Sequence, residues 1–94
     1  MTTMKYSVVL STKFRKDRKR LKKRGYNLTL LEEIVEKLAN GETLPGKNKD
    51  HRLTGNLANF RECHIAPDWL LVYRINADVL ELWLMETGTH SDLF

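Results

Sequence analysis

Residues 69–86, WLLVYRINADVLELWLME, constrain the fold most strongly, because they hold two apolar runs that only a short polar segment separates. Both runs have the length of ordinary strands, and NAD at 76–78 is short enough for a β-hairpin. A third run, NFRECHI at 59–65, comes before them and is separated from the next by APD. The three runs predict an antiparallel three-strand meander.

The N-terminal half begins with a predicted strand and a predicted helix. KYSVVL at 5–10 is rich in residues that favour strands. In the helix that follows, Ser11 or Thr12 is expected to be the N-cap. Phe14 and Leu21 are the large apolar residues of this helix. They are seven residues apart and share one face, so they can hold the helix against a core.

A second helix is predicted within residues 27–41, NLTLLEEIVEKLANG. Thr29 and Glu32 have the spacing of a capping box at its start. Gly25 and Gly41 are expected to follow the last residues of the two helices. The apolar stripe of the second helix is predicted to consist of Leu30, Ile34 and Leu38.

This order of elements predicts a single α+β domain over residues 1–94, with the helices on one face of a mostly antiparallel sheet. A chain of 94 residues with 41% hydrophobic residues can form one small core. The single cysteine, Cys63, excludes an internal disulfide and favours a reducing compartment. The apolar run YSVVL is too short for a signal peptide or a membrane span. We therefore expect a cytoplasmic protein without a membrane partner.

Basic residues concentrate in one segment. Residues 13–24, KFRKDRKRLKKR, hold nine Lys/Arg and one Asp, a net charge of +8, whereas the rest of the chain holds seven basic and eleven acidic residues, a net charge of −4. Such a stripe is typical of a surface that binds polyphosphate. We favour binding of nucleic acid as the role of this segment. The alternative is a solvated helix face that only keeps the protein soluble. The predicted ribosome- and RNA-binding residues are Lys13, Arg15, Lys16, Lys19, Arg20, Lys22 and Lys23.

Alternation along the first strand of the meander assigns its side chains to two faces. Arg61 and Cys63 are expected on one face, and Glu62 and His64 on the other, with Phe60 on the side of His64. If the helices cover the face of Cys63, Glu62 and His64 become neighbours on an accessible surface. The opposite register would bury both of them without partners, which is costly.

The chain has three histidines, His51, His64 and His90. A metal site is disfavoured, because no two of them have a local ligand spacing and the lone cysteine has no CxxC partner. A nucleophilic Cys63 is disfavoured, because alternation places it opposite His64. Metal-free cleavage of RNA is a third option, since imidazoles exchange protons near neutral pH and cations stabilise the added phosphate charge. From spacing alone, histidines without a catalytic role are an equal alternative.

Spaced motifs cover the C-terminal half densely. In chain order they are Asp50-His51, Leu53-Thr54-Gly55, Arg61, His64, Pro67-Asp68-Trp69, Tyr73, Gly88-Thr89-His90 and Leu93-Phe94. This series resembles the YafQ branch of the RelE-type bacterial toxins. The N-terminal half is similar to that family only in its layout of one strand and two helices, the first of them basic.

The resemblance implies a RelE/ParE-like fold and a ribosome-dependent endoribonuclease that cuts mRNA in the A site without a cofactor. Proteins of this family belong to toxin–antitoxin pairs and are held inactive by a cognate antitoxin. The partners implied are therefore an antitoxin, the ribosome and its A-site message.

Carried over to this sequence, the family's catalytic residues are His51, His64, Asp68 and His90, with Phe94 shaping the site. His90 is expected to be the general acid at the leaving oxygen. His64 and Asp68 are expected to act on the attacking hydroxyl, and His51 to hold the phosphate. We also expect Phe94 to be buried, because an imidazole so near the end of the chain needs an anchor to act at hydrogen-bond distance.

Arg61 and Glu62 are expected to be further substrate contacts, although alternation directs Arg61 away from His64. Glu86 departs from the family pattern, since relatives often carry a basic residue there. The alternative function keeps the fold without the chemistry: a ParE-like or RNA-binding toxin that inhibits its target by binding alone.

Overall fold

The computed structural model describes residues 4–94, which form a five-stranded sheet, two long helices and a short third one. Strand β1 (Ser7–Leu10) leads into helices α1 (Thr12–Lys23) and α2 (Leu28–Ala39). The 3₁₀ turns η1 (Gly46–Asn48) and η2 (Gly55–Leu57) flank strand β2 (His51–Arg52). The remaining elements are β3 (Arg61–Ala66), β4 (Trp69–Asn76), β5 (Glu81–Gly88) and α3 (His90–Leu93).

The strand order in the sheet is β1-β5-β4-β3-β2. Only β1 runs parallel to its neighbour, β5, and the other pairs are antiparallel. The predicted α+β fold and the meander of β3, β4 and β5 are confirmed. Strand β2 was not predicted, because it lies in a segment whose Gly, Pro and Asn content indicates a loop and it is only two residues long.

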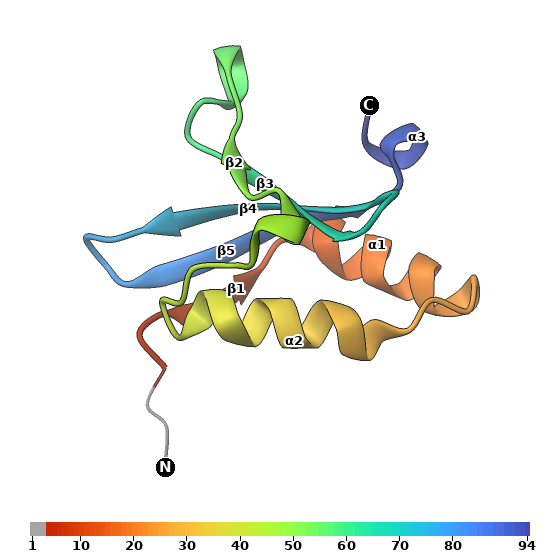
Figure 1. Cartoon of the computed structure of the whole chain (residues 1–94), viewed down its shortest axis with the longest axis horizontal. Helices are drawn as coiled ribbons and strands as arrows, with labels where there is room; N and C mark the ends of the chain where they lie inside the picture. The colour runs from red at the N-terminus through yellow and green to blue at the C-terminus, as the bar shows by residue number, and fades with distance from the viewer. Residues whose placement is uncertain (1–3) are drawn as a thin grey trace.

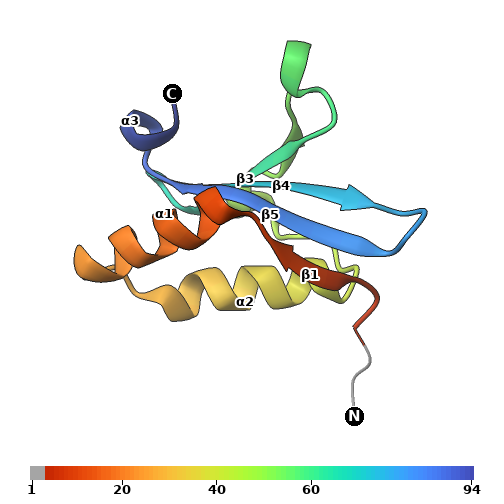
Figure 2. The same ribbon diagram turned by 180° about the vertical axis from the view of Figure 1, so that it is seen from behind.

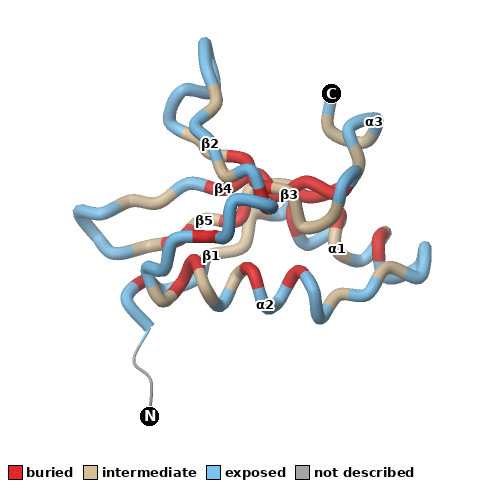
Figure 3. The backbone as a smooth tube through the Cα atoms, in the orientation of Figure 1, coloured by how far each residue is buried: buried red, intermediate tan, exposed pale blue. Residues whose placement is uncertain are grey.

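Helices α1 and α2 lie together on one side of the sheet, as expected, while η2 and α3 rise from the other side (Figures 1 and 2). Most buried residues lie along the strands and on the inward sides of the helices (Figure 3). On the helix side, the strands contribute Cys63, Leu71, Tyr73, Leu82 and Leu84 to the core. None of the helices in residues 4–94 is long and apolar enough to cross a membrane.

Both ends of α1 follow the prediction. Ser11 is the N-cap, and its hydroxyl accepts a hydrogen bond from the Phe14 backbone N–H at 2.9 Å. Phe14 and Leu21 are buried. Gly25 follows the helix with a φ of 86°, a conformation that glycine adopts without a steric penalty.

The start of α2 differs from the prediction. Asn27 is the N-cap, and its side chain accepts a hydrogen bond from the Thr29 backbone N–H at 3.1 Å, so the expected capping box of Thr29 and Glu32 does not form. The predicted stripe is also wrong at one position. Leu30 is 41% exposed, whereas Leu31 is 1% exposed and packs in the core. The buried side of α2 includes Leu31 in place of Leu30, because the helix packs against both α1 and the sheet.

A buried polar network joins α1 to the sheet. Asp17 is 2% exposed and accepts hydrogen bonds from Lys13, Arg20 and the backbone N–H of Thr87, each at 3.1 Å. The Thr87 hydroxyl accepts from the Trp69 indole N–H at 2.9 Å and donates to the Leu70 carbonyl at 2.7 Å. The single acid of the basic helix therefore ties it to β4 and β5.

Candidate active site

The candidate site lies on the sheet face opposite α1 and α2, which we call the site face. Strand pairing aligns His51 with Glu62, and His64 with Leu70. The prediction that Glu62 and His64 share this face is confirmed. The expectation that Glu62 is accessible is wrong, because only 6% of it is exposed. Its Oε1 lies 3.8 Å from His51 Nε2, so the carboxylate has a cationic partner whenever that imidazole is protonated.

His90 and Asp68 are joined by two hydrogen bonds. The Nδ1 atom of His90 lies 2.7 Å from Asp68 Oδ1, and the His90 backbone N–H donates to the same oxygen at 3.2 Å. These two hydrogen bonds lower the pKa of Asp68, so it is a carboxylate at neutral pH. A carboxylate at Nδ1 favours the tautomer with a proton there. The Nε2 atom is then left to exchange a proton with a substrate.

The buried Trp69 side chain holds the neighbouring Asp68 in place. Its indole packs edge-on against the Tyr26 ring with 5.1 Å between centroids, and its N–H donates to Thr87. Asp68 is the residue before this buried anchor, in the turn between β3 and β4. The Pro-Asp-Trp motif thus presents an exposed carboxylate from a buried support.

His64 joins the pair formed by Asp68 and His90. The ring centroids of His64 and His90 lie 6.0 Å apart, so the two imidazoles are direct neighbours on the site face. The His64 carbonyl accepts a hydrogen bond from the Asn48 side-chain N–H at 2.7 Å, which attaches η1 to β3. His51 pairs with the strand position two residues from His64, and its Nδ1 lies 2.7 Å from the Lys49 carbonyl oxygen.

Polar contacts hold α3, rather than a buried phenylalanine. Phe94 is 69% exposed, so the expectation that it is an anchor is wrong. Thr89 and Asp92 form a capping box, and Arg24 donates to both Asp92 oxygens at 2.8 and 3.2 Å. A Cβ atom at Gly88 would lie 2.9 Å from that of Asp92, so this close approach requires glycine.

Arg61 lies away from the group formed by His64, Asp68 and His90. It pairs in register with Tyr73, whose side chain is in the helix-side core. Its Nε donates to Asp50 Oδ1 at 3.3 Å, and the Tyr73 hydroxyl donates to the same oxygen at 2.6 Å. The structure therefore gives Arg61 a partner on the face opposite His64. Sequence reasoning missed this link, because only the strand pairing brings Asp50 and Tyr73 together.

Cys63 has no access to solvent. Burial raises the pKa of its thiol to about 12, which disfavours the reactive thiolate at neutral pH. The interpretation of Cys63 as a structural residue fits this environment.

Part of the basic helix is engaged in ion pairs. Lys13 and Arg20 pair with Asp17, Arg18 with Glu32, and Arg24 with Asp92. Within residues 4–94, no such pair involves Arg15, Lys16, Lys19, Lys22 or Lys23. These five side chains are exposed, so they present an unpaired cationic stripe to solvent.

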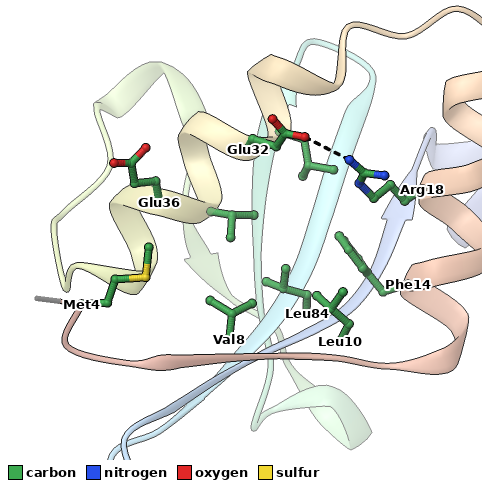
Figure 4. A pocket seen from close by; sticks show the side chains of 10 residues that line it. Met4, Val8, Leu10, Phe14, Arg18, Glu32, Glu36 and Leu84 are labelled. Atoms are coloured by element: carbon green, nitrogen blue, oxygen red, sulfur yellow. Dashed lines mark hydrogen bonds and ion pairs between the residues drawn. The ribbon is translucent and has the colours of Figure 1, made fainter.

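An apolar hollow lies on the helix side, between β1, α1 and α2, as Figure 4 shows. The Arg18–Glu32 ion pair stands at its rim. No histidine lines it, and it carries none of the acid–base groups described above. Its apolar lining includes Met4, Val8, Leu10, Phe14, Leu31, Val35 and Leu84.

Comparison with protein families gives one match that spans nearly the whole chain. Residues 6–94 match the family described as the YafQ bacterial toxin of type II toxin–antitoxin systems. The mRNA interferase toxin YafQ of Escherichia coli strain K12 is 35% identical over 85 residues, which are 89% of this chain and 90% of that protein.

Solved structures agree with this match. A metal-bound toxin from Helicobacter pylori is 47% identical with a TM-score of 0.89, over 95% of this chain and 99% of that one. YafQ in the Escherichia coli DinJ–YafQ toxin–antitoxin complex is 33% identical with a TM-score of 0.88, over 97% and 99%. In the present chain, no three His, Cys, Asp or Glu side chains of residues 4–94 gather closely enough to hold a metal ion.

Proposed function

The chain belongs to the YafQ family of bacterial type II toxins, and we propose that it is a ribosome-dependent mRNA interferase that cleaves A-site message by acid–base catalysis. The observation that carries this proposal is the group formed by His64, His90 and Asp68, with two imidazoles 6.0 Å apart and a carboxylate on one of them. Cleavage by a 2′-hydroxyl needs two proton-transfer groups on either side of one phosphate. Ribosome-bound message as the substrate also implies a cytoplasmic site of action.

His64 is the proposed general base and His90 the general acid. His64 takes the proton from the 2′-hydroxyl as its oxygen forms a bond to phosphorus. The bond from phosphorus to the 5′-oxygen breaks, and His90 Nε2 gives that oxygen its proton. The products are a 2′,3′-cyclic phosphate and a 5′-hydroxyl. Histidine suits both steps, because its pKa lies near the working pH.

Asp68 takes a different role from the one expected from the family pattern. Its carboxylate contacts His90 twice, so we assign it to orienting the acid rather than to the attacking hydroxyl. His51 reaches the site face from β2 and is the proposed phosphate contact. Glu62 is buried beside it and is better suited to orienting His51 than to binding RNA directly.

The chemistry of the new RNA ends tests this function. Attack by the 2′-hydroxyl predicts 5′-hydroxyl ends, whereas attack by a metal-activated water would leave 5′-phosphates. Purified protein should be incubated with translating ribosomes and a defined message, and the 5′ ends mapped with and without prior kinase treatment. Ends that ligate without the kinase step would refute the mechanism. Growth arrest with intact message would favour the binding-only alternative.

The cationic stripe of α1 is proposed to bind ribosomal RNA. Replacing Lys16, Lys19 and Lys23 by Gln should weaken ribosome binding and reduce its dependence on salt, by about 0.7–0.9 in logarithmic slope for each phosphate that the protein no longer neutralises. Single-turnover cleavage at saturating ribosome should change much less. The measurement is cosedimentation across a salt series. Unchanged binding would leave the stripe with a role in solubility alone.

An antitoxin is the proposed regulatory partner, since the related Escherichia coli toxin was solved in complex with one, DinJ. The charge of α1 suits an antitoxin segment rich in Asp and Glu, and the apolar hollow beside it can receive apolar side chains. Binding there would cover the same stripe that is proposed to bind ribosomal RNA.

Phe94 is proposed to stack on a base of the message. Because its side chain is largely exposed, deleting it should leave the melting temperature within about 1 °C of the parent value. Removing one stacked aromatic ring, which contributes about 1–3 kcal/mol, should lower kcat/KM by about 5- to 150-fold. Replacing Phe94 by Trp should restore cleavage. Parental activity in the deletion variant would exclude a substrate contact.

A further inference from the structure

A hollow of about 370 Å³ opens beside His64 and is lined by two lysines, Lys47 and Lys49. They flank Asn48, which is buried and donates a hydrogen bond to the His64 carbonyl. The other lining residues, 65–67, continue β3 toward Asp68. This hydrogen bond attaches the turn that carries both lysines to the strand of the proposed base.

The ammonium groups of these lysines are free of local anions. Within residues 4–94, neither makes an ion pair. Asp50, which follows Lys49, turns its carboxylate toward Arg61 and Tyr73 on the other face. The hollow is therefore a cationic recess beside a strand position that carries an acid–base group.

Lys49 has a left-handed backbone, with φ 47° and ψ 44°. Glycine, or less often Asn, is the residue that takes this conformation without strain. Strained positions of this kind gather at functional sites, where the side chain is needed. The backbone of Lys49 also turns its carbonyl toward His51 Nδ1, at 2.7 Å. One residue thus orients a histidine and brings a cation to the hollow.

The site face needs such cations. Glu62 lies on it, and Glu86 is placed on it by pairing with Val72, next to Glu62. RNA brings one negative charge per nucleotide to this face, and the extra charge of the transition state adds to it. Arg61 is held on the opposite face by Asp50. Lys47 and Lys49 are the cations that line the hollow beside His64.

We infer that this hollow is a substrate subsite, in which Lys47 and Lys49 bind the phosphate of the message nucleotide next to the cleaved bond. The inference rests on the proposed endoribonuclease function. It adds a substrate-binding group outside the motifs that resemble the family. It also identifies cations that offset the acidic Glu62 and Glu86.

The variant Lys49→Gly removes the ammonium group and keeps the role of the backbone. Glycine can adopt the left-handed conformation and retains the carbonyl that contacts His51. The variant should melt at or above the parent temperature. Its cleavage of saturating ribosome-bound message should fall about tenfold or more, as expected for the loss of a hydrogen bond to a charged group. Lys47→Gln should have a smaller effect in the same direction, and Lys49→Arg should recover part of the activity. Lys5→Gln, just before β1, is the matched control for loss of one charge.

A second measurement does not depend on catalysis. The probe is an RNA trinucleotide with a 2′-deoxy group at the cleavage position, titrated by NMR into the full chain. Parent protein should show shifts at Lys47, Lys49 and His64, and Lys49→Gly should weaken binding and lower the salt slope by about 0.7. If parent protein cleaves message while Lys49→Gly cleaves and binds the probe as well as the parent does, the subsite is refuted. If parent protein cleaves no message, the proposed function itself fails.

Discussion

His90→Ala is expected to slow cleavage of ribosome-bound mRNA by about 10²–10⁴-fold, the size of effect typical of a lost acid–base group. The side chain is exposed and contacts Asp68, so its removal costs the fold little. The measurement is single-turnover cleavage at saturating ribosome, with thermal melting and ribosome cosedimentation as controls. Cleavage at the parental rate would show that the general acid is misassigned.

Asp68→Asn is the matched variant for the positioning role. Asparagine keeps a side-chain oxygen for the His90 N–H groups but removes the negative charge that favours a proton on Nδ1. The loss should be smaller than that of His90→Ala. The loss should appear in kcat with KM nearly unchanged, because Asp68 contacts His90. A loss confined to KM would argue that Asp68 does not act through His90.

Asp17→Ala should be the most destabilising of these substitutions. It removes the acceptor of the buried Thr87 N–H, which costs about 1–3 kcal/mol when left unpaired. For a domain of this size, a loss of about 2 kcal/mol lowers Tm by roughly 8–16 °C. Lys13 and Arg20 remain partly in solvent and regain hydration, so they add little to the loss.

Asp17→Asn separates the hydrogen bond from the charge. It keeps an oxygen that can accept a hydrogen bond from the Thr87 N–H. Its loss of stability should therefore be less than half of the loss caused by Asp17→Ala. Both variants should be measured by thermal melting at neutral pH and moderate salt. A Tm within about 2 °C of the parent for Asp17→Ala would mean that the network does not fasten α1 to the sheet.

The fold could be predicted from the sequence where the signal is local. Alternation assigned Glu62, Cys63 and His64 to the correct faces. The ends of α1 were also predicted, with Ser11 or Thr12 as the N-cap and Gly25 after the last residue. The start of α2 could not be settled in this way. Asn27 and Thr29 are both good N-cap residues, and their local sequence does not decide between them.

The sequence indicated which residues gather at the candidate site better than it indicated their contacts. His64 and His90 were expected to belong to one catalytic group, and their ring centroids lie 6.0 Å apart. The pairing of Asp68 with His90 spans 22 positions and depends on the turn between β3 and β4 meeting α3. The need to hold His90 near the end of the chain favoured burial of Phe94, but the ion pair of Arg24 with Asp92 supplies the anchor instead. No pattern along the chain marks a contact between side chains that are far apart in sequence.

Helix α3 is an appendage to a core that is complete without it, since the core residues fall between Tyr6 and Leu84. Ending the polypeptide after Gly88 would therefore keep all five strands and both long helices while discarding the proposed acid. In a cell, nonsense or frameshift mutations in the last codons of the gene would therefore remove the activity of this protein without unfolding it. The same truncation offers a way to produce the folded domain in quantity without killing the expression host, and α3 could be restored afterwards by ligating a synthetic peptide.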